Sequence, residues 1–130
     1  EELRAIAQEY RCPVWTASQT NRSGLNAEVI TMESISEAFS KCFVADFIFS
    51  VSRTIEGKSA KTGRIFVAKN RNGPDGLIYP IFMDPSNVAI EVLQPTGETA
   101  GDIIANSIKD QAAALRDKYK EFKKDKNGRE

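Results

Sequence analysis

The chain has 130 residues, of which 41% are hydrophobic, so it is long enough for one domain with a hydrophobic core and too short for two. Its 18 basic and 18 acidic side chains balance, so any contact with nucleic acid must come from a local patch. The absence of histidine excludes histidine-based triads, histidine metal sites and histidine acid–base catalysis. Cys12 and Cys42 are too few and too far apart for a zinc site, and they are expected to be free, buried thiols in a reducing cytosol.

The first predicted element is an amphipathic helix, with apolar residues on one face at Leu3, Ile6, Ala7 and Tyr10. Pro13 is expected to end this helix, because the residue before a proline avoids the α region. Residues 14–18 form an apolar run and are predicted as a buried strand, so that helix and strand would make the second half of a βαβ unit. The sequence opens inside this helix and without Met, which suggests a piece of a longer or processed protein.

The next part of the chain alternates polar and apolar stretches. Residues 21–31 are polar with little periodicity and are predicted to form a mobile loop, whereas residues 32–41 have a helical pattern. Residues 45–51 are predicted as a second buried strand, and residues 54–62 as a polar connection. The two strands of this first half are expected to lie parallel in one sheet.

The second half is predicted to be an antiparallel meander. A strand at 64–69 is expected to pair back on its predecessor, and the Gly-Pro turn at 72–76 predicts a hairpin to a strand at 77–83. A turn at 84–87 then leads to a short final strand at 88–93. The predicted fold class is therefore α/β, with parallel strands followed by an antiparallel meander and a C-terminal helix.

The C-terminal helix follows a predicted linker over residues 94–101. Thr99 and Asp102 are spaced as a capping box at the start of a helix of about 20 residues. One face of this helix carries an apolar stripe, formed by Ile104, Ile108, Leu115, Tyr119 and Phe122. Its highly charged end is typical either of a solvated, fraying helix or of a tail that docks on a partner, and the sequence leaves both interpretations open.

Two long cations mark the end of the third predicted strand. Lys69 and Arg71 are two residues apart, so on a strand their side chains share one face. The turn that follows is rigid at Pro74 and permissive at its two glycines. Paired cationic tips at a rigid strand end are suited to anionic phosphoryl groups, although two ordinary charges on a solvated strand edge would have the same spacing.

Two motifs of the chain resemble those of DnaB-like replicative helicases, which are hexameric helicases with RecA-type ATPase domains. Residues 18–22 read Ser-Gln-Thr-Asn-Arg, where the family has Ser-Gln-x-Asn-Arg after a strand. Residues 69–76 read Lys-Asn-Arg-Asn-Gly-Pro-Asp-Gly, where the family has Lys-x-Arg-Asn-Gly-Pro-x-Gly. The resemblance covers roughly residues 1–93, and its details are most similar to the phage branch of the family.

The resemblance implies the C-terminal half of a RecA-like P-loop NTPase sheet over residues 1–95, followed by a linker and a charged amphipathic helix over 96–130. Arg71 would be the arginine finger that reaches the ATP of a neighbouring subunit, and Lys69 the lysine that accompanies it. Gln19 would be the glutamine that senses the γ-phosphate, because a neutral amide can both donate and accept hydrogen bonds. A strand-end glutamine that satisfies loop backbone is the alternative.

The resemblance also implies that a loop over residues 21–36 grips single-stranded DNA, with Arg22 as its only cation. The candidate DNA contacts are Asn21, Arg22, Ser36 and Glu37. Residues 36–39 read Ser-Glu-Ala-Phe, where many bacterial relatives have Arg-Glu-Ser-Gly, so the motif does not fix individual contacts. Backbone amides can still hold phosphates without a cation.

A RecA-type ATPase needs a Gly-x-x-x-x-Gly-Lys-Ser/Thr loop for phosphate and a carboxylate for magnesium, and this sequence contains neither motif. In the family both lie upstream of the opening helix. ATP and Mg²⁺ are therefore expected as cofactors bound mainly outside this chain, and the 130 residues alone are expected to hydrolyse no ATP. Asp46 is expected to serve as a structural cap or loop anchor.

The sequence thus favours part of an ATP-driven 5′-to-3′ replicative DNA helicase that forms a hexameric ring. Single-stranded DNA and a primase or helicase loader are the expected partners. A recombinase-type RecA-fold ATPase and a non-catalytic module that binds partners through its last helix remain as alternatives. No apolar run approaches the roughly 18–20 residues that a membrane span needs. The resemblance implies the cytoplasm of a bacterial cell or phage-infected host.

Overall fold

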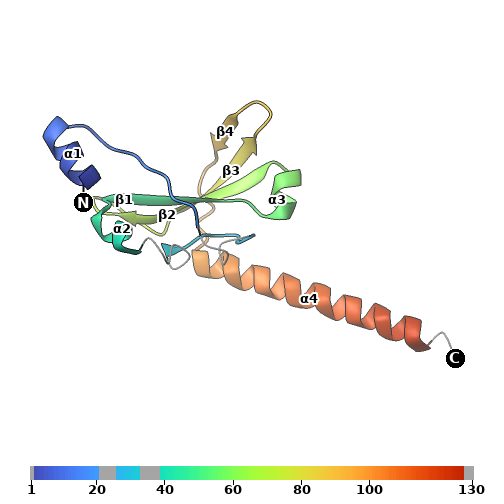
Figure 1. The fold of residues 1–130 in the computed structure, drawn as a ribbon. Helices are drawn as coiled ribbons and strands as arrows, with labels where there is room; N and C mark the ends of the chain where they lie inside the picture. Colours follow the sequence, from blue (N-terminus) through green and yellow to red (C-terminus); the bar gives the residue numbers. More distant parts are fainter. Residues whose placement is uncertain (1, 21–25, 33–38, 128–130) are drawn as a thin grey trace.

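A computed structural model describes residues 2–20, 26–32 and 39–127 of the chain. The described residues form a four-stranded sheet with helices around it, and a long C-terminal helix that extends away from the sheet (Figure 1). The helices are α1 (Glu2–Tyr10), α2 (Phe39–Val44), α3 (Ile55–Ser59) and α4 (Ala100–Asn127). The strands are β1 (Phe47–Ser52), β2 (Thr62–Asn70), β3 (Ile78–Asp84) and β4 (Ala89–Val92). The α/β class and the C-terminal helix are thereby confirmed.

The sheet has the order β1-β2-β3-β4, and each strand pairs antiparallel with the next. The predicted meander is therefore confirmed, including the hairpin between β2 and β3. The prediction of a strand at residues 14–18 is wrong, because this segment has no strand pairing with the described residues and is exposed. Its contact with the sheet is made instead by Trp15, whose ring centroid lies 6.2 Å from that of Phe47 and 6.0 Å from that of Phe49. An apolar run becomes a strand only where a neighbour satisfies its backbone, so the predicted parallel pairing is absent from the described part of the chain.

The core lies where the start of α4 meets the sheet. Ile78 and Ile81 of β3 are 2% and 1% exposed, and Ile78 packs in one cluster with Val29 and Ile103. Strand β1 is less buried than predicted, because every second residue from Phe47 to Val51 is exposed. The core is therefore small and centred on β3 rather than on the first strands of the chain. The prediction of two buried thiols is correct for Cys42 and wrong for Cys12, which lies in the exposed segment after α1.

The described part of the predicted mobile loop over residues 21–31, residues 26–31, is held against the sheet, and residues 21–25 lie outside the described residues. Val29 and Ile30 are buried. The backbone beside them is also tied to the sheet, since the hydroxyls of Ser50 and Ser52 donate to the carbonyls of Ile30 and Glu28 over 2.6 and 2.7 Å. Burial of these apolar residues and the two hydrogen bonds together hold the segment against the sheet.

The observed helices lie close to their predicted positions but differ from the predictions in length. Helix α1 ends at Tyr10, three residues before Pro13, where Arg11 adopts a positive φ of 50°. Helix α2 covers only the end of the predicted helix at 32–41 and continues to Val44; residues 33–38 lie outside the described part. The predicted polar connection contains the short helix α3, whose N-cap Thr54 accepts from the Gly57 N–H over 3.0 Å.

The capping box that begins α4 is confirmed. The Asp102 N–H donates to Thr99 Oγ1 over 3.2 Å, and the Thr99 N–H donates to Asp102 Oδ2 over 3.1 Å. Hydrogen bonds from the Thr99 side chain and backbone lower the pKa of the Asp102 carboxyl. The helix runs for 28 residues, longer than predicted, and no helix of the described ranges is long and apolar enough to cross a membrane.

The buried carboxylate of Asp84 holds the turn between β3 and β4. Its hydrogen bonds make the stability of the fold depend on pH. Asp84 accepts hydrogen bonds from Lys61 Nζ and from the Ser86 hydroxyl, each over 2.6 Å. The bond from Lys61, followed by that from Ser86, lowers the pKa of Asp84 from 3.8 to about 2. Because the folded-state pKa lies below the unfolded value, this stabilisation is complete above about pH 4 and is lost as the pH falls towards about 2.

Asp84→Asn is expected to lower the free energy of unfolding at neutral pH and to cost progressively less as the pH falls from about 4 to about 2. Urea unfolding of the wild type and the variant across this range measures the difference. A difference that stays constant down to the lowest pH would contradict the assignment, because the carboxylate charge would then not be the source of the stabilisation.

Candidate functional site

The two cations predicted to act on phosphate lie at the C-terminal end of β2, where the pairing with β1 is irregular. Lys69 is opposite Ile48 and Val67 is opposite Phe49, so Ala68 is an extra residue between consecutive partners. Such a β-bulge bends the strand and re-aims the side chains that follow it. The bulge therefore sets the direction in which Lys69 and the residues after it leave the sheet.

Lys69 reaches from β2 to the C-terminal end of helix α2. Its Nζ donates to the Cys42 carbonyl over 2.8 Å and to the Phe43 carbonyl over 3.4 Å. The last carbonyls of a helix lack partners within the helix and carry partial negative charge, so a lysine there is favourable. Lys69 is thus a helix-capping cation in this structure.

Arg71 is paired with Asp46, the residue just before β1. The Arg71 N–H donates to the Asp46 carbonyl over 2.9 Å, and the guanidinium forms an ion pair with the Asp46 carboxylate. A second arginine, Arg4 of α1, lies 3.6 Å from the same carboxylate and donates to the Val44 carbonyl over 2.9 Å. Asp46 therefore acts as the loop anchor that the sequence predicted, and it does so by holding two arginines.

This corner of the molecule, formed by Arg4, Asp46, Lys69 and Arg71, is called the cationic corner below. It contains three cations and one carboxylate, and the Arg71 and Asp46 side chains are 43% and 56% exposed. An anion from outside can therefore reach the Arg71 guanidinium without disturbing the core. The guanidinium is already paired with a carboxylate oxygen of Asp46, so its geometry suits an oxygen anion as a partner.

The turn after Arg71 is fixed by the side chain of Asn70. Its Oδ1 accepts from the Asn72 N–H over 3.3 Å, and its Nδ2 donates to the Pro74 carbonyl over 3.2 Å. A Cβ at Gly73 would lie 2.8 Å from Asn70 Nδ2, so only glycine fits without a shift. Gly76 has a φ of 75°, in the left-handed region that favours glycine. The rigid turn predicted from the motif is therefore present in the structure.

The structure does not bring every candidate residue to this corner. Gln19 is exposed and makes no hydrogen bond with the other described residues. The candidate DNA contacts Asn21, Arg22, Ser36 and Glu37 lie outside the described residues. The residues that the structure describes contain no cluster of three acidic or cysteine side chains able to hold a metal ion.

Arg4 is the member of the cationic corner that the sequence did not indicate. It lies 67 positions before Arg71 on an amphipathic helix, where a cation is ordinarily part of the solvated face. No local pattern distinguishes it. Its contact with Asp46 depends on how α1 folds against the loop before β1.

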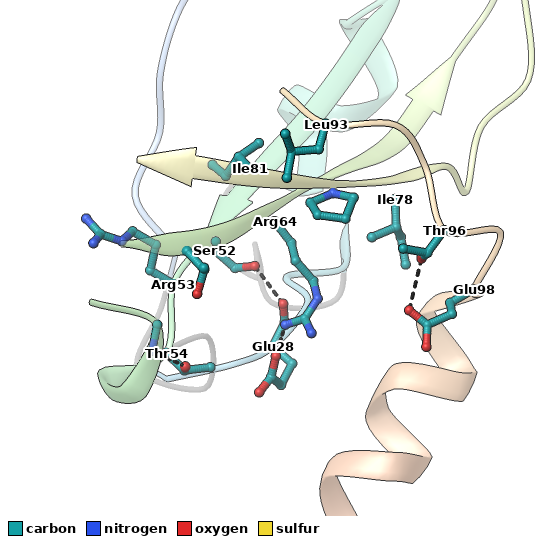
Figure 2. Close-up of a pocket in the computed structure, with 14 residues that line it drawn as sticks. Glu28, Ser52, Arg53, Thr54, Arg64, Ile78, Ile81, Leu93, Thr96 and Glu98 are labelled. Carbon is teal, nitrogen blue, oxygen red and sulfur yellow. Dashed lines mark hydrogen bonds and ion pairs between the residues drawn. The ribbon is translucent and has the colours of Figure 1, made fainter. Parts of the chain in front are cut away.

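A pocket of about 330 Å³ lies at the opposite end of β2 and was also not predicted (Figure 2). Arg64 on its wall forms an ion pair with Glu28, and the Arg53 Nε is buried without a hydrogen-bond partner among the described residues. Arg64 is five residues from Lys69, or about 17 Å along a strand. The pocket is therefore separate from the cationic corner.

Comparison with known proteins finds one informative similarity. The chain is 34% identical over 73 residues to a DnaB-like replicative helicase of Enterobacteria phage T4. The aligned residues make up 56% of this chain and 15% of that helicase. No family model and no solved structure matches. The chain spans only 15% of the length of this relative. The similarity supports a relationship of this chain to DnaB-like replicative helicases.

Proposed function

We propose that this chain is part of an ATP-driven replicative DNA helicase that translocates 5′ to 3′ on single-stranded DNA as a hexameric ring. The observation that carries the proposal is the exposed Arg71 guanidinium on a turn fixed by Asn70, with Lys69 beside it at the end of β2. The similarity to the phage T4 helicase supports the same proposal. The finer fold, the C-terminal half of a RecA-like sheet with parallel strands completed by other parts of the protein, belongs to this proposal.

In the proposed mechanism Arg71 acts on the ATP bound by a neighbouring subunit. Its planar guanidinium would exchange the Asp46 carboxylate for the oxygens of the transferring phosphoryl group, which replaces one anionic partner with another. Charge that develops on those oxygens would then be stabilised by a donor already in position. Lys69 would contribute a second positive charge as a point donor, after leaving the carbonyls at the end of α2.

The other expected contacts are part of the same proposal. Gln19 would sense the γ-phosphate, and Asn21, Arg22, Ser36 and Glu37 would face single-stranded DNA. The donor groups of the cationic corner fit phosphate oxygens, and the sequence contains no Gly-x-x-x-x-Gly-Lys-Ser/Thr motif. The phosphate-binding loop and the magnesium carboxylate would therefore come from parts of the protein outside these 130 residues. A primase or helicase loader would be the protein partner, in the cytoplasm of a bacterial or phage-infected cell.

The proposal is tested with the full-length protein on forked DNA that carries a 5′ single-stranded tail. We expect strand separation that requires hydrolysable ATP, and no separation when only the opposite strand has a tail. A recombinase-type ATPase would instead coat the DNA and hydrolyse ATP without separating the fork. ATP hydrolysis by the isolated 130 residues above a blank would contradict the claim that the phosphate-binding loop lies elsewhere.

A further inference from the structure

One face of helix α4 is apolar and exposed, and the proposed function does not use it. Read as heptads, its a and d positions are all apolar over three consecutive repeats. These positions, called the α4 seam below, are Ala105, Ile108, Ala112, Leu115, Tyr119 and Phe122. Its four large members are between 60% and 71% exposed. The seam is therefore a continuous apolar face with no cover from the described residues.

The way in which α4 is anchored turns the seam away from the sheet. Ile103, the buried residue that joins α4 to the core, lies on the helix about 150° from the centre of the seam. Figure 1 shows the rest of α4 extending beyond the sheet into solvent. While Ile103 is packed in the core, the seam faces away from the described part of the sheet and is free to bind a separate helix.

The shape of the seam favours another helix over a lipid surface. A strict a/d pattern is the narrow stripe of a coiled coil, whereas helices that lie in a membrane interface have a broad apolar face. Ala105 and Ala112 alternate with the large residues Ile108 and Leu115. Small residues at a positions let a second helix approach closely, and the large residues on either side can pack around it.

The charges beside the seam indicate which charges a partner helix should carry. Lys109, Arg116 and Lys123 follow one edge at all three e positions. The other edge is mixed, with Gln111, Lys118 and Asp125 at its g positions. The Lys123 Nζ lies 5.6 Å from the centroid of the Tyr119 ring, which holds one of these cations against the seam. In a pair of α4 helices like charges would face each other, as between Lys118 and Lys123 of a parallel pair. A second copy of this chain is therefore disfavoured.

We propose that the α4 seam docks an amphipathic helix of a partner protein whose apolar stripe is flanked by Glu and Asp. The apolar stripe would fill the spaces between Ile108, Leu115 and Phe122, and the acidic flanks would pair with the four cations. This inference does not depend on the proposed helicase function, because it uses only the face and the charges of α4.

Two designed peptides test the proposal with the full 130-residue chain. Both carry Ile and Leu at a and d positions, and one has Glu and the other Lys at every e and g position. We expect the Glu peptide to bind about 10- to 100-fold more tightly than the Lys peptide at low salt, with a difference that shrinks as salt is added. Fluorescence anisotropy of labelled peptides measures both affinities, and equal binding of the two would overturn the charge assignment.

Variants separate the seam from the rest of α4. Leu115→Ser is expected to weaken binding of the Glu peptide about tenfold or more, whereas Ala113→Ser on the other side of the helix is expected to leave it unchanged. Arg116→Glu, Lys118→Glu and Lys123→Glu together should reverse the preference, so that the Lys peptide binds more tightly. This reversal does not depend on whether Leu115→Ser perturbs the helix.

Two further results would overturn the proposal. One is self-association of the chain, measured by sedimentation, that is tighter than binding of the Glu peptide and is lost in Leu115→Ser. The other is binding of the chain to phosphatidylglycerol vesicles without binding to either peptide, which would make the seam a membrane-surface helix. A preference for the Glu peptide together with its reversal in the triple variant supports the proposed partner.

Discussion

Arg71→Ala in the full-length protein is expected to lower ATP hydrolysis by about two to five orders of magnitude while leaving ATP binding nearly unchanged. The reason is that a guanidinium aimed at the transferring phosphoryl group acts mainly on charge that develops in the transition state. Single-turnover hydrolysis and binding of a fluorescent nucleotide measure the two quantities separately. Arg71→Lys should recover little activity, because an ammonium lacks the planar fork.

Asp46→Asn is the matched control for this experiment, since it breaks the same ion pair from the other side. An exposed pair of this kind contributes at most about 1 kcal/mol to stability, so the variant should fold normally and keep hydrolysis within a few-fold of the wild type. If Asp46→Asn lost as much hydrolysis as Arg71→Ala, the ion pair itself would be the essential feature, and the role of Arg71 would be structural.

Ile81→Ala is expected to lower the free energy of unfolding by about 2 to 5 kcal/mol, because the residue is almost completely buried and the surrounding side chains can refill the space only in part. Its exposed fraction is 1%, the lowest among the core residues. The core of this chain is small, so a loss of this size removes much of its stability. Urea unfolding followed by circular dichroism measures it.

Ile90→Ala on the adjacent strand β4 is the control, because it removes the same atoms from a side chain that is 60% exposed. Its cost should stay below about 1 kcal/mol. Similar losses in the two variants would mean that β3 does not form the centre of the core.

The parts of the fold that local signals determine were predictable from the sequence. The Gly-Pro turn at 72–76 predicted the β2–β3 hairpin, and the spacing of Thr99 and Asp102 predicted the start of α4. The rigid turn beside Arg71 was predictable for the same reason, since its glycine and proline positions are local. The phosphate-facing role of Lys69 and Arg71 remains a prediction.

The parts that depend on tertiary contacts were not predictable. Val29 is buried because it packs between Ile78 of the sheet and Ile103 at the start of α4, and no periodicity in the polar stretch around it marks this. Residues 14–18 have the composition of a strand but no strand partner within the ranges that the structure describes, since pairing requires a neighbouring backbone. Arg4 joins the cationic corner through the fold of α1 against the loop before β1, which no spacing along the chain reveals.

The central claim is that Arg71 acts across a subunit interface, and mixing two inactive forms of the full-length protein tests it most directly. One form carries Arg71→Ala, and the other has its phosphate-loop lysine replaced. In mixed rings some interfaces pair an intact phosphate loop with an intact Arg71, so ATP hydrolysis is expected to return in the mixture although each form alone is inactive. If rings shown to be mixed hydrolyse no more ATP than the separate forms, Arg71 acts within its own subunit or only in the structure, and the account is contradicted.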